Sequence, residues 1–292
     1  MATVSQVARI SLKNILFPTD FSPASEAALP FAWVLARLYG ATLQVAHVIL
    51  PASHPQVLGP HLPAELDSVW DAARNRLDWF THHCGHSDVP CRALLGNGDL
   101  ADVIPQLIRE HEVDMVVVGT QGRRGFSKMM MGSGAERIYR SAQCPVLTVG
   151  PQAAAGEWKL RRILCPVEVE QDPEPALRYG LSLAEENQAE FIVMQAVPMI
   201  PWQHRARVEA QAFRRLTGLI PESAKDWSTP EIMVRWEHPA EATLQAAAER
   251  QVDLVVMGVR RARAAGLSAH LPWPVASEVV SLAPCPVLTV RV

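Results

Sequence analysis

A glycine-rich stretch after an apolar run carries the residues best suited to bind an anion. Residues 119–134, GTQGRRGFSKMMMGSG, follow the run DMVVVG and lead into the helix-like pattern AERIYRSA. Gly119 and Gly122 allow positive φ and close approach of the backbone to a ligand, because no Cβ stands in the way. Arg123 and Arg124 add positive charge beside them. Alternatively, the glycines make a turn and the arginines form a solvated face.

The end of this stretch predicts the start of a helix. Gly132, Ser133 and Gly134 precede the helical pattern, and the free N–H groups and dipole at a helix N-terminus favour an anion. Ser133 could cap the helix or donate its hydroxyl to a phosphate oxygen. These features suit a di- or triphosphate, although neither a Walker A loop nor a G-x-G-x-x-G motif occurs in the sequence.

A second polar segment is expected on the same side of the fold. The apolar run NILF ends in PTDFS, which supplies Asp20 and Ser22. Open α/β sheets bind ligands at the carboxyl ends of their strands, where the winding reverses. If the first and fourth strands are neighbours there, Asp20 and Ser22 meet residues 119–134 in one crevice. Asp20 and Ser22 are also alternative caps for the helix that follows them.

The elements that must position these residues alternate along the chain. Apolar runs without polar alternation predict strands buried on both faces, as in a parallel sheet; they are NILFP, LQVAHVI, DMVVVG and PVLTV. Helical patterns lie between them at 25–39, 63–84, 100–110 and 135–141. Such alternation implies right-handed crossovers and a doubly wound α/β domain.

The chain repeats itself. Three segments match in the same order: 13–22 with 161–170, 113–121 with 252–260, and 143–150 with 284–292. We therefore expect two copies of one domain, at residues 1–150 and 157–292. The small-residue stretch 151–156 is expected to link them.

Composition limits the classes of function. The 292 residues include 27 Lys plus Arg and 30 Asp plus Glu, for a net charge of −3, so no bulk charge favours nucleic acid or an anionic membrane. No apolar run approaches the roughly 18 residues that span a bilayer, and no secretory signal is evident. Five scattered cysteines predict free thiols in a reducing compartment, and hence a cytoplasmic protein.

The spacing Gly119-x2-Gly122-x9-Gly132-Ser133 resembles the nucleotide motif of the universal stress protein (UspA-like) family, and ILFPTDFS, MGSGAERI and CPVLTV agree with it. The resemblance covers nearly the whole chain as a tandem pair. It implies two tandem flavodoxin/Rossmann-like three-layer sandwiches, each with a five-stranded parallel sheet, and an adenine nucleotide as ligand. It also implies that the CPVLTV strands pair the two copies as a pseudo-dimer, and a homodimer of the chain is a further expectation.

The resemblance also implies roles for particular residues. Those expected beside the adenosine are Pro18, Thr19 and Asp20, with Val48 against the adenine. Those expected to hold the ribose and phosphates are Gly119, Gly122, Gly132, Ser133 and Gly134, with positive charge from Arg123. No catalytic residue is assigned. The segment THHCGH (81–86) could ligate zinc, but its spacing is irregular, and no metal ligand is assigned.

The expected function is that of an ATP-binding regulatory protein of the stress response, with Mg²⁺ as a further ligand and an unidentified protein partner. The alternatives are a slow ATPase or a protein that phosphorylates itself, and a structural module with an empty pocket. The absence of a Walker lysine and of an identifiable general base weighs against the enzyme.

The second copy departs from the motif. Gly258 matches Gly119, but Arg261 replaces Gly122 and Glu168 replaces Asp20. Trp273 and Pro274 fall near the second half of the motif, where Trp would fill the cleft and Pro lacks the N–H that an anion needs. We therefore expect no ATP in the second domain.

Overall fold

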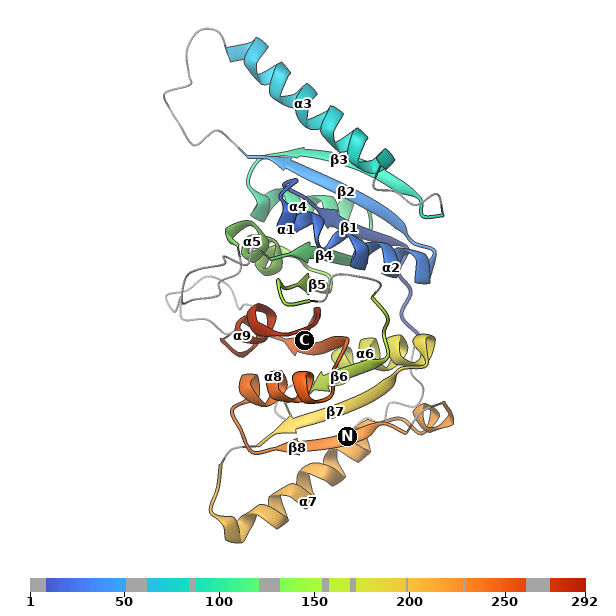
Figure 1. Ribbon diagram of the computed structural model, residues 1–292, viewed down its shortest axis with the longest axis vertical. Helices are drawn as coiled ribbons and strands as arrows, with labels where there is room; N and C mark the ends of the chain where they lie inside the picture. The colour runs from blue at the N-terminus through green and yellow to red at the C-terminus, as the bar shows by residue number, and fades with distance from the viewer. Residues whose placement is uncertain are drawn as a thin grey trace. The chain divides into compact units, whose positions relative to one another are not determined.

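The computed structural model describes residues 9–50, 62–83, 88–120, 132–153, 158–168, 172–197, 199–227, 229–260 and 274–292. In the first half of the chain the elements are β1 Asn14–Pro18, α1 Pro23–Glu26, α2 Leu29–Tyr39, β2 Thr42–Ile49, α3 Leu62–His83, β3 Cys91–Asn97, α4 Leu100–Glu110, β4 Met115–Gly119, α5 Ser133–Ser141 and β5 Val146–Val149 (Figure 1). In the second half they are β6 Arg162–Pro166, α6 Glu174–Asn187, β7 Glu190–Ala196, α7 Trp202–Leu219, the 3-10 helix η2 Glu222–Asp226, β8 Glu231–Arg235, α8 Pro239–Glu249, β9 Leu254–Val259, α9 Pro274–Leu282 and β10 Val287–Arg291.

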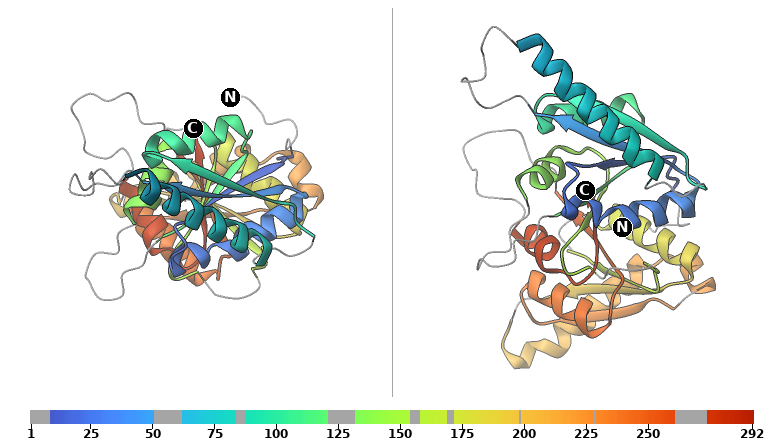
Figure 2. Two further views of the ribbon diagram at one scale, coloured as in Figure 1. Left: turned by 90° about the horizontal axis from the view of Figure 1, so that it is seen from above. Right: turned by 45° about the horizontal axis from the view of Figure 1, so that its top comes forward.

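Both halves have the same strand order. It is β3-β2-β1-β4-β5 in the first half and β8-β7-β6-β9-β10 in the second, with parallel ladders joining β1 to β2 and β4, and β6 to β7 and β9. Right-handed crossovers in this order place α2 and α3 on one face of the first sheet and α4 and α5 on the other, and Figure 2 shows helices flanking the strands. The predicted tandem, three-layer α/β fold is confirmed, in the Rossmann order.

The described residues divide into two compact units. One contains the described residues between 11 and 120 and between 132 and 146, and the other contains the described residues between 147 and 292 together with residues 9–10. In the second unit the Ile10 N–H donates to the buried Ser182 hydroxyl at 2.9 Å.

The core consists of strands that are buried on both faces, as their continuous apolar sequence predicts. Ile15, Leu16 and Phe17 of β1 have no exposed surface. Gly40 ends α2 at φ 61°, in the left-handed region that glycine adopts without strain. The helix expected over 25–39 is two helices, because Pro30 stands at the start of α2 and has no N–H to continue the hydrogen bonds of α1.

One aspartate in each half ties the first strand of the sheet to the fourth. Asp114 Oδ2 accepts hydrogen bonds from the N–H groups of Lys13 (2.6 Å) and Asn14 (2.9 Å). Asp253 Oδ2 accepts in the same way from Arg161 (2.8 Å) and Arg162 (2.9 Å). The Val-Asp dipeptide occurs in both halves, as Val113-Asp114 and Val252-Asp253. It therefore has a structural role, because its carboxylate is a charged acceptor that fixes the start of the first strand in each half.

Replacing Asp114 by alanine is expected to lower the unfolding free energy of its unit by about 1 kcal/mol, because two strand N–H groups lose a charged acceptor at a place that water reaches. Chemical denaturation followed by circular dichroism measures the change, and Asp253→Ala is the matched variant for the other unit. An unchanged denaturation midpoint for Asp114→Ala would contradict this role.

Cys165 and Cys285 are buried thiols. Burial raises the pKa of the Cys285 thiol to about 12, helped by the nearby Asp253 charge, and burial also raises the pKa of Cys165. Cys91 and Cys144 are half-buried. Of the helices in the described ranges, none is both long and apolar enough to cross a membrane.

Because thiolate is the reactive form, Cys165 and Cys285 are expected to resist iodoacetamide at neutral pH in the folded protein and to react on unfolding. Peptide mass spectrometry after timed labelling measures each site, with Cys91 and Cys144 as internal references. Labelling of Cys165 as fast as Cys91 in the native protein would contradict this expectation.

Candidate functional site

A cavity of about 410 Å³ lies in the first unit at the carboxyl ends of β1, β2 and β4, beside the start of α5. Its volume is within the roughly 300–1,000 Å³ of small-molecule sites. Eight of the ten predicted site residues line it: Pro18, Thr19, Asp20, Val48, Gly119, Gly132, Ser133 and Gly134. The other two, Gly122 and Arg123, lie outside the described residues. The two segments expected to converge therefore do so, because β1 and β4 are neighbours.

Hydrogen bonds fix the loop after β1. The Thr19 N–H donates to the carbonyl of Ala46 on β2 at 2.8 Å, and the Thr19 hydroxyl accepts from the Phe21 N–H at 2.9 Å. His47 Nδ1 lies 2.8 Å from the Thr19 carbonyl oxygen. Thr19 is buried, so this residue shapes the cavity wall through its backbone and hydroxyl contacts.

Phe21 holds an unusual backbone conformation in this loop. Its φ is 58°, in a region that costs a residue with a Cβ of the order of 1–3 kcal/mol. The ring packs on His47 with centroids 4.6 Å apart. Arg76 of α3 lies 4.6 Å over the same ring and donates to the Phe21 carbonyl at 3.2 Å. These contacts hold the strained residue in place.

Asp20 is an exposed carboxylate on the cavity wall. Partial burial raises its pKa, but hydrogen bonds from Ser22 and Ser25 outweigh this and hold the pKa below its ordinary value. Its Oδ1 accepts from the Ser22 N–H at 2.9 Å, while the Ser22 hydroxyl caps α1 by accepting from the Ser25 N–H at 3.2 Å. The capping role that the sequence left open thus belongs to Ser22, and Asp20 is charged at neutral pH.

The start of α5 corrects one prediction. Gly132, with φ −58°, is the N-cap, and no side chain caps the helix, so Ser133 is the first helical residue and does not cap it. The first bond within the helix runs from the Glu136 N–H to the Gly132 carbonyl. The N–H groups of Ser133, Gly134 and Ala135 have no acceptor within the helix, and all three residues line the cavity.

Position 119 must be a glycine for a reason other than positive φ. Its φ is not in the left-handed region. A Cβ added there would lie 2.2 Å from the Ala24 carbonyl oxygen and 3.2 Å from Ser25 Cα. The glycine was expected to let a ligand approach the backbone closely. In the structure it is α1 of the protein itself that comes close to Gly119, because α1 packs against the end of β4.

Two of the lining residues that were not predicted from the sequence carry a basic side chain. His47 is the first, through its contacts to Thr19 and Phe21. Arg137 is the second, and its Nη1 donates to Asp99 Oδ2 at 2.8 Å. The sequence could have indicated Arg137, because it follows Ser133 by four residues and the two therefore lie on one helix face.

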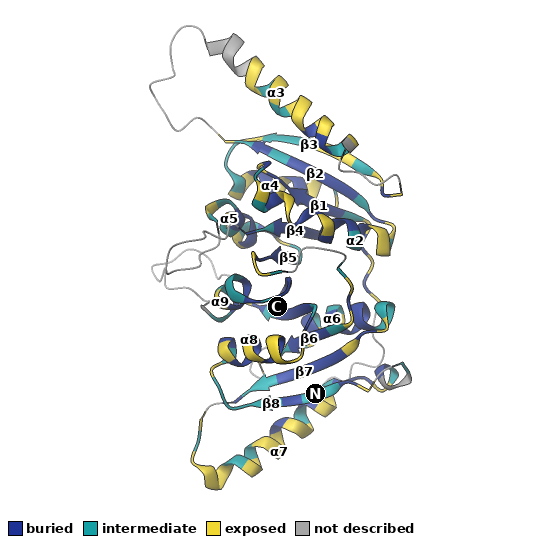
Figure 3. Cartoon of the chain, viewed as in Figure 1, coloured by how far each residue is buried: buried dark blue, intermediate teal, exposed yellow. Residues whose placement is uncertain are grey.

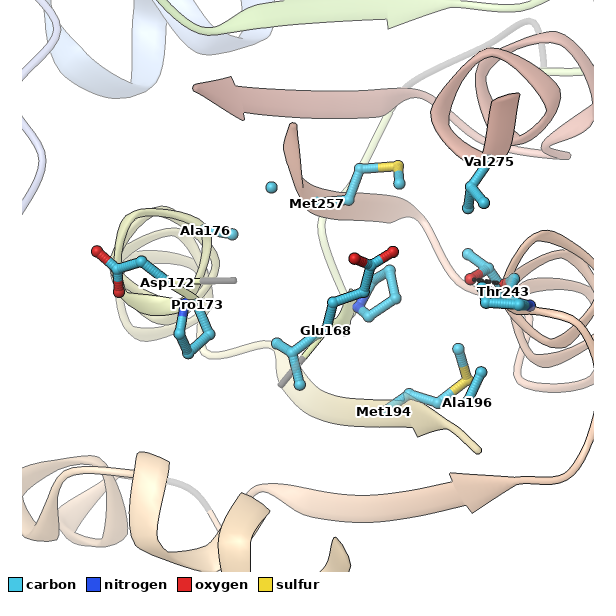
Figure 4. A pocket seen from close by; sticks show the side chains of 13 residues that line it. Glu168, Asp172, Pro173, Ala176, Met194, Ala196, Thr243, Met257 and Val275 are labelled. Atoms are coloured by element: carbon cyan, nitrogen blue, oxygen red, sulfur yellow. Dashed lines mark hydrogen bonds between the residues drawn. The ribbon is translucent and has the colours of Figure 1, made fainter. Parts of the chain in front are cut away.

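The corresponding place in the second unit holds a much smaller pocket of about 60 Å³. It is lined by residues that include Pro166, Glu168 and Gly258, the counterparts of Pro18, Asp20 and Gly119. Figure 4 shows Glu168 among the side chains of this pocket, with Met194 and Met257 close by.

Strand register explains the difference in volume. Pro18 pairs with Ala46 on β2, whereas Pro166 pairs with Met194 on β7. Leu16 pairs with Val116 on β4, and its counterpart Leu164 pairs with Val255 on β9. Two residues further along these strands, the second half therefore has Met257 where the first half has Val118. Two methionines thus occupy the counterparts of Ala46 and Val118, which line the large cavity. Trp273, which the sequence predicts to fill the cleft, lies outside the described residues.

The fold and site define a class: tandem Rossmann-like α/β domains, the first with a ligand-sized cavity where its sheet reverses winding. Comparison with known proteins specifies the family. The profile of the universal stress protein family matches residues 11–150 and 159–291, and the chain belongs to this family, once in each half.

Named relatives agree with this assignment. The chain is 32% identical over 140 residues to universal stress protein A homolog 1 of Coxiella burnetii, covering 47% of this chain and 95% of that protein. It is 28% identical over 144 residues to universal stress protein MJ0531 of Methanocaldococcus jannaschii, covering 47% and 81%. A universal stress protein structure from Archaeoglobus fulgidus matches 95% of this chain and 98% of its own with a TM-score of 0.73 and 16% identity, which shows a shared fold.

Proposed function

We propose that the first domain binds ATP in the cavity between β1, β2, β4 and α5, and that the chain is a cytoplasmic regulatory protein of the stress response. The observation that carries the proposal is the convergence of Asp20 and the free N–H groups of α5 on one ligand-sized cavity. The nucleotide motif quoted from the sequence supports adenine nucleotide over other anions.

The residues present fit the parts of a nucleotide. The N–H groups of Ser133 and Gly134, with the Ser133 hydroxyl, suit phosphate oxygens. Val48, which is 9% exposed at the end of β2, gives an apolar wall for a base. The Asp20 carboxylate suits a ribose hydroxyl or base N–H.

Asp20 also fits a magnesium ion held with the nucleotide. Mg²⁺ is commonly bound through one or two carboxylates together with substrate phosphates and water. Among the described lining residues, Asp20 supplies the carboxylate. The ion would supply positive charge between Asp20 and the phosphates, which would otherwise repel each other.

Regulation would follow from population shift. Nucleotide binds one conformation of the segments around the cavity more tightly and so changes the surface that a protein partner meets. We expect added ATP to increase the protection of backbone amides from hydrogen exchange near β4 and the start of α5. Equal protection with and without ATP would argue against a switch.

The direct test is mass spectrometry of small molecules released by denaturing protein purified without added nucleotide, followed by calorimetry with ATP and GTP. We expect ATP to be released and to rebind with one site per chain. Release of ADP together with turnover of added ATP would favour the slow ATPase, and a phosphate found on the protein would favour autophosphorylation. If no nucleotide is released and none binds, the remaining interpretation is a structural module with an empty pocket.

A further inference from the structure

Arg137 of α5 brings positive charge to the wall of the large cavity in the first unit. It follows Ser133 by about one helical turn, and the side chains of an α-helix lean toward its N-terminus. The Arg137 side chain therefore leaves the helix toward the turn of Ser133 and Gly134, whose N–H groups have no acceptor within the helix. It is 52% exposed, so a ligand in the cavity can reach its guanidinium.

His47, the other basic side chain among the described residues that line the cavity, is already held in the cavity wall. Its Nδ1 lies 2.8 Å from the Thr19 carbonyl oxygen, and its ring packs on Phe21. Arg137 Nη1 donates to Asp99 Oδ2 at 2.8 Å, which uses one of the five N–H donors of a guanidinium. Of the two, Arg137 is therefore better able to bind a ligand anion.

The ion pair between Arg137 and Asp99 joins α5 to α4. Asp99 is the N-cap of α4, where its Oδ1 accepts from the Ala101 N–H at 2.8 Å. Both helices carry exposed as well as buried residues (Figure 3), and the Asp99 side chain is 44% exposed. Because water screens the attraction within such an exposed pair, the pair is weak. Arg137 can therefore exchange Asp99 for a phosphate at little cost.

The second half of the chain reverses the charge at the same position. In its repeat, Glu278 of α9 is the counterpart of Arg137, and His238, the N-cap of α8, is the counterpart of Asp99. A pair that served only to join two helices could carry its charges in either order, whereas a phosphate at the helix start requires the cation on α5. The cation occurs in the half with the 410 Å³ cavity, and the anion occurs in the half whose pocket is about 60 Å³.

We propose that Arg137 binds the terminal phosphates of the nucleotide, and that Asp99 competes with those phosphates for its guanidinium. This inference rests on the proposed function, because it assigns a residue to the phosphate end of the same cavity. Arginine binds phosphate through two parallel N–H···O bonds, each stronger than a bond between neutral groups. The site therefore distinguishes nucleotides by their number of phosphates: Arg137 strengthens the binding of ATP most, that of ADP less and that of adenosine not at all.

Calorimetry of the full chain with ATP, ADP and adenosine tests the assignment. Arg137→Gln keeps a side chain that can donate to Asp99 but removes the positive charge. We expect its affinity for ATP to fall at least about tenfold, as on loss of a hydrogen bond to a charged group, and its affinity for ADP to fall less. Its affinity for adenosine should be unchanged, which also shows that the variant is folded.

Asp99→Asn separates phosphate binding from a role in joining the helices. Asparagine also caps a helix N-terminus, so α4 keeps its cap while Arg137 loses its charged partner. We expect the affinity for ATP to rise about twofold, because a competing carboxylate is gone. The control is Arg140→Gln, which removes one positive charge from the same helix. Arg140 pairs with Glu136 and is not among the described residues that line the cavity, so this variant should bind all three ligands like the wild type.

If the wild type binds ATP and Arg137→Gln binds it equally well, this inference is wrong and the proposed function stands. The inference is also wrong if Asp99→Asn loses as much ATP affinity as Arg137→Gln, since the ion pair would then act only by joining α4 to α5. Equal losses for adenosine and ATP, or an equal loss of ATP affinity in Arg140→Gln, would overturn it as well. A wild type that binds no ATP would overturn both the proposed function and this inference.

Discussion

Replacing Ala46 and Val118 together by methionine is expected to weaken ATP binding at least about hundredfold, a loss of about 3 kcal/mol, while the protein stays folded. Both residues line the 410 Å³ cavity. Their counterparts in the second half are Met194 and Met257, where the pocket is about 60 Å³. The second domain therefore shows that this fold accommodates methionine at both positions. The added side chains would occupy the space that we assign to the nucleotide.

Calorimetry with ATP measures the loss, and a thermal scan by circular dichroism checks that the variant is folded. The matched control is Met194→Leu with Met257→Leu, a volume-conserving change that should leave ATP affinity unaltered. If the folded Ala46→Met, Val118→Met protein still binds ATP like the wild type, the nucleotide does not bind in this cavity.

Replacing Gly119 by alanine is expected to disrupt both stability and ATP binding. The new Cβ would lie 2.2 Å from the Ala24 carbonyl oxygen, and because a backbone atom cannot rotate away, α1 must shift. Overpacking of this kind costs typically about 1–3 kcal/mol. The shift would carry Ser22 and the segment that holds Asp20, so we expect ATP affinity to fall at least about tenfold.

Gly258→Ala is the matched control, since it is the same change at the same place in the second half. Its Cβ would lie 3.1 Å from Val292 Cγ1, a side-chain atom that can move, so a smaller loss of stability and unaltered ATP affinity are expected. Denaturation midpoints and calorimetry on both variants make the comparison. Equal effects of the two substitutions would show that Gly119 has no special role in holding α1.

A further double variant separates two explanations for the unequal halves. From the sequence, we expect no ATP in the second domain because of its missing glycines and Trp273. The structure adds that Met194 and Met257 reduce the space available. If space alone prevents binding, Met194→Ala with Met257→Val would create a second ATP site; if donors are also missing, it would not.

The sequence by itself determined the tandem α/β fold and the location of the candidate site. Continuous apolar runs specify buried parallel strands locally. The loops after β1 and β4 meet if these two strands are neighbours, a premise of the sequence interpretation that the structure bears out. For this reason Asp20, Ser133 and Gly134 could be assigned to one crevice from their positions at strand ends and a helix start.

The tertiary structure alone decided what individual residues do there. Gly119 makes room for the Ala24 backbone, Ser22 rather than Asp20 caps α1, and Gly132 rather than Ser133 caps α5. Which side chains share the cavity with Pro18 depends on the register of β1 against strands far away in the sequence. Local patterns do not encode that register, because it is fixed by packing between elements that are distant along the chain.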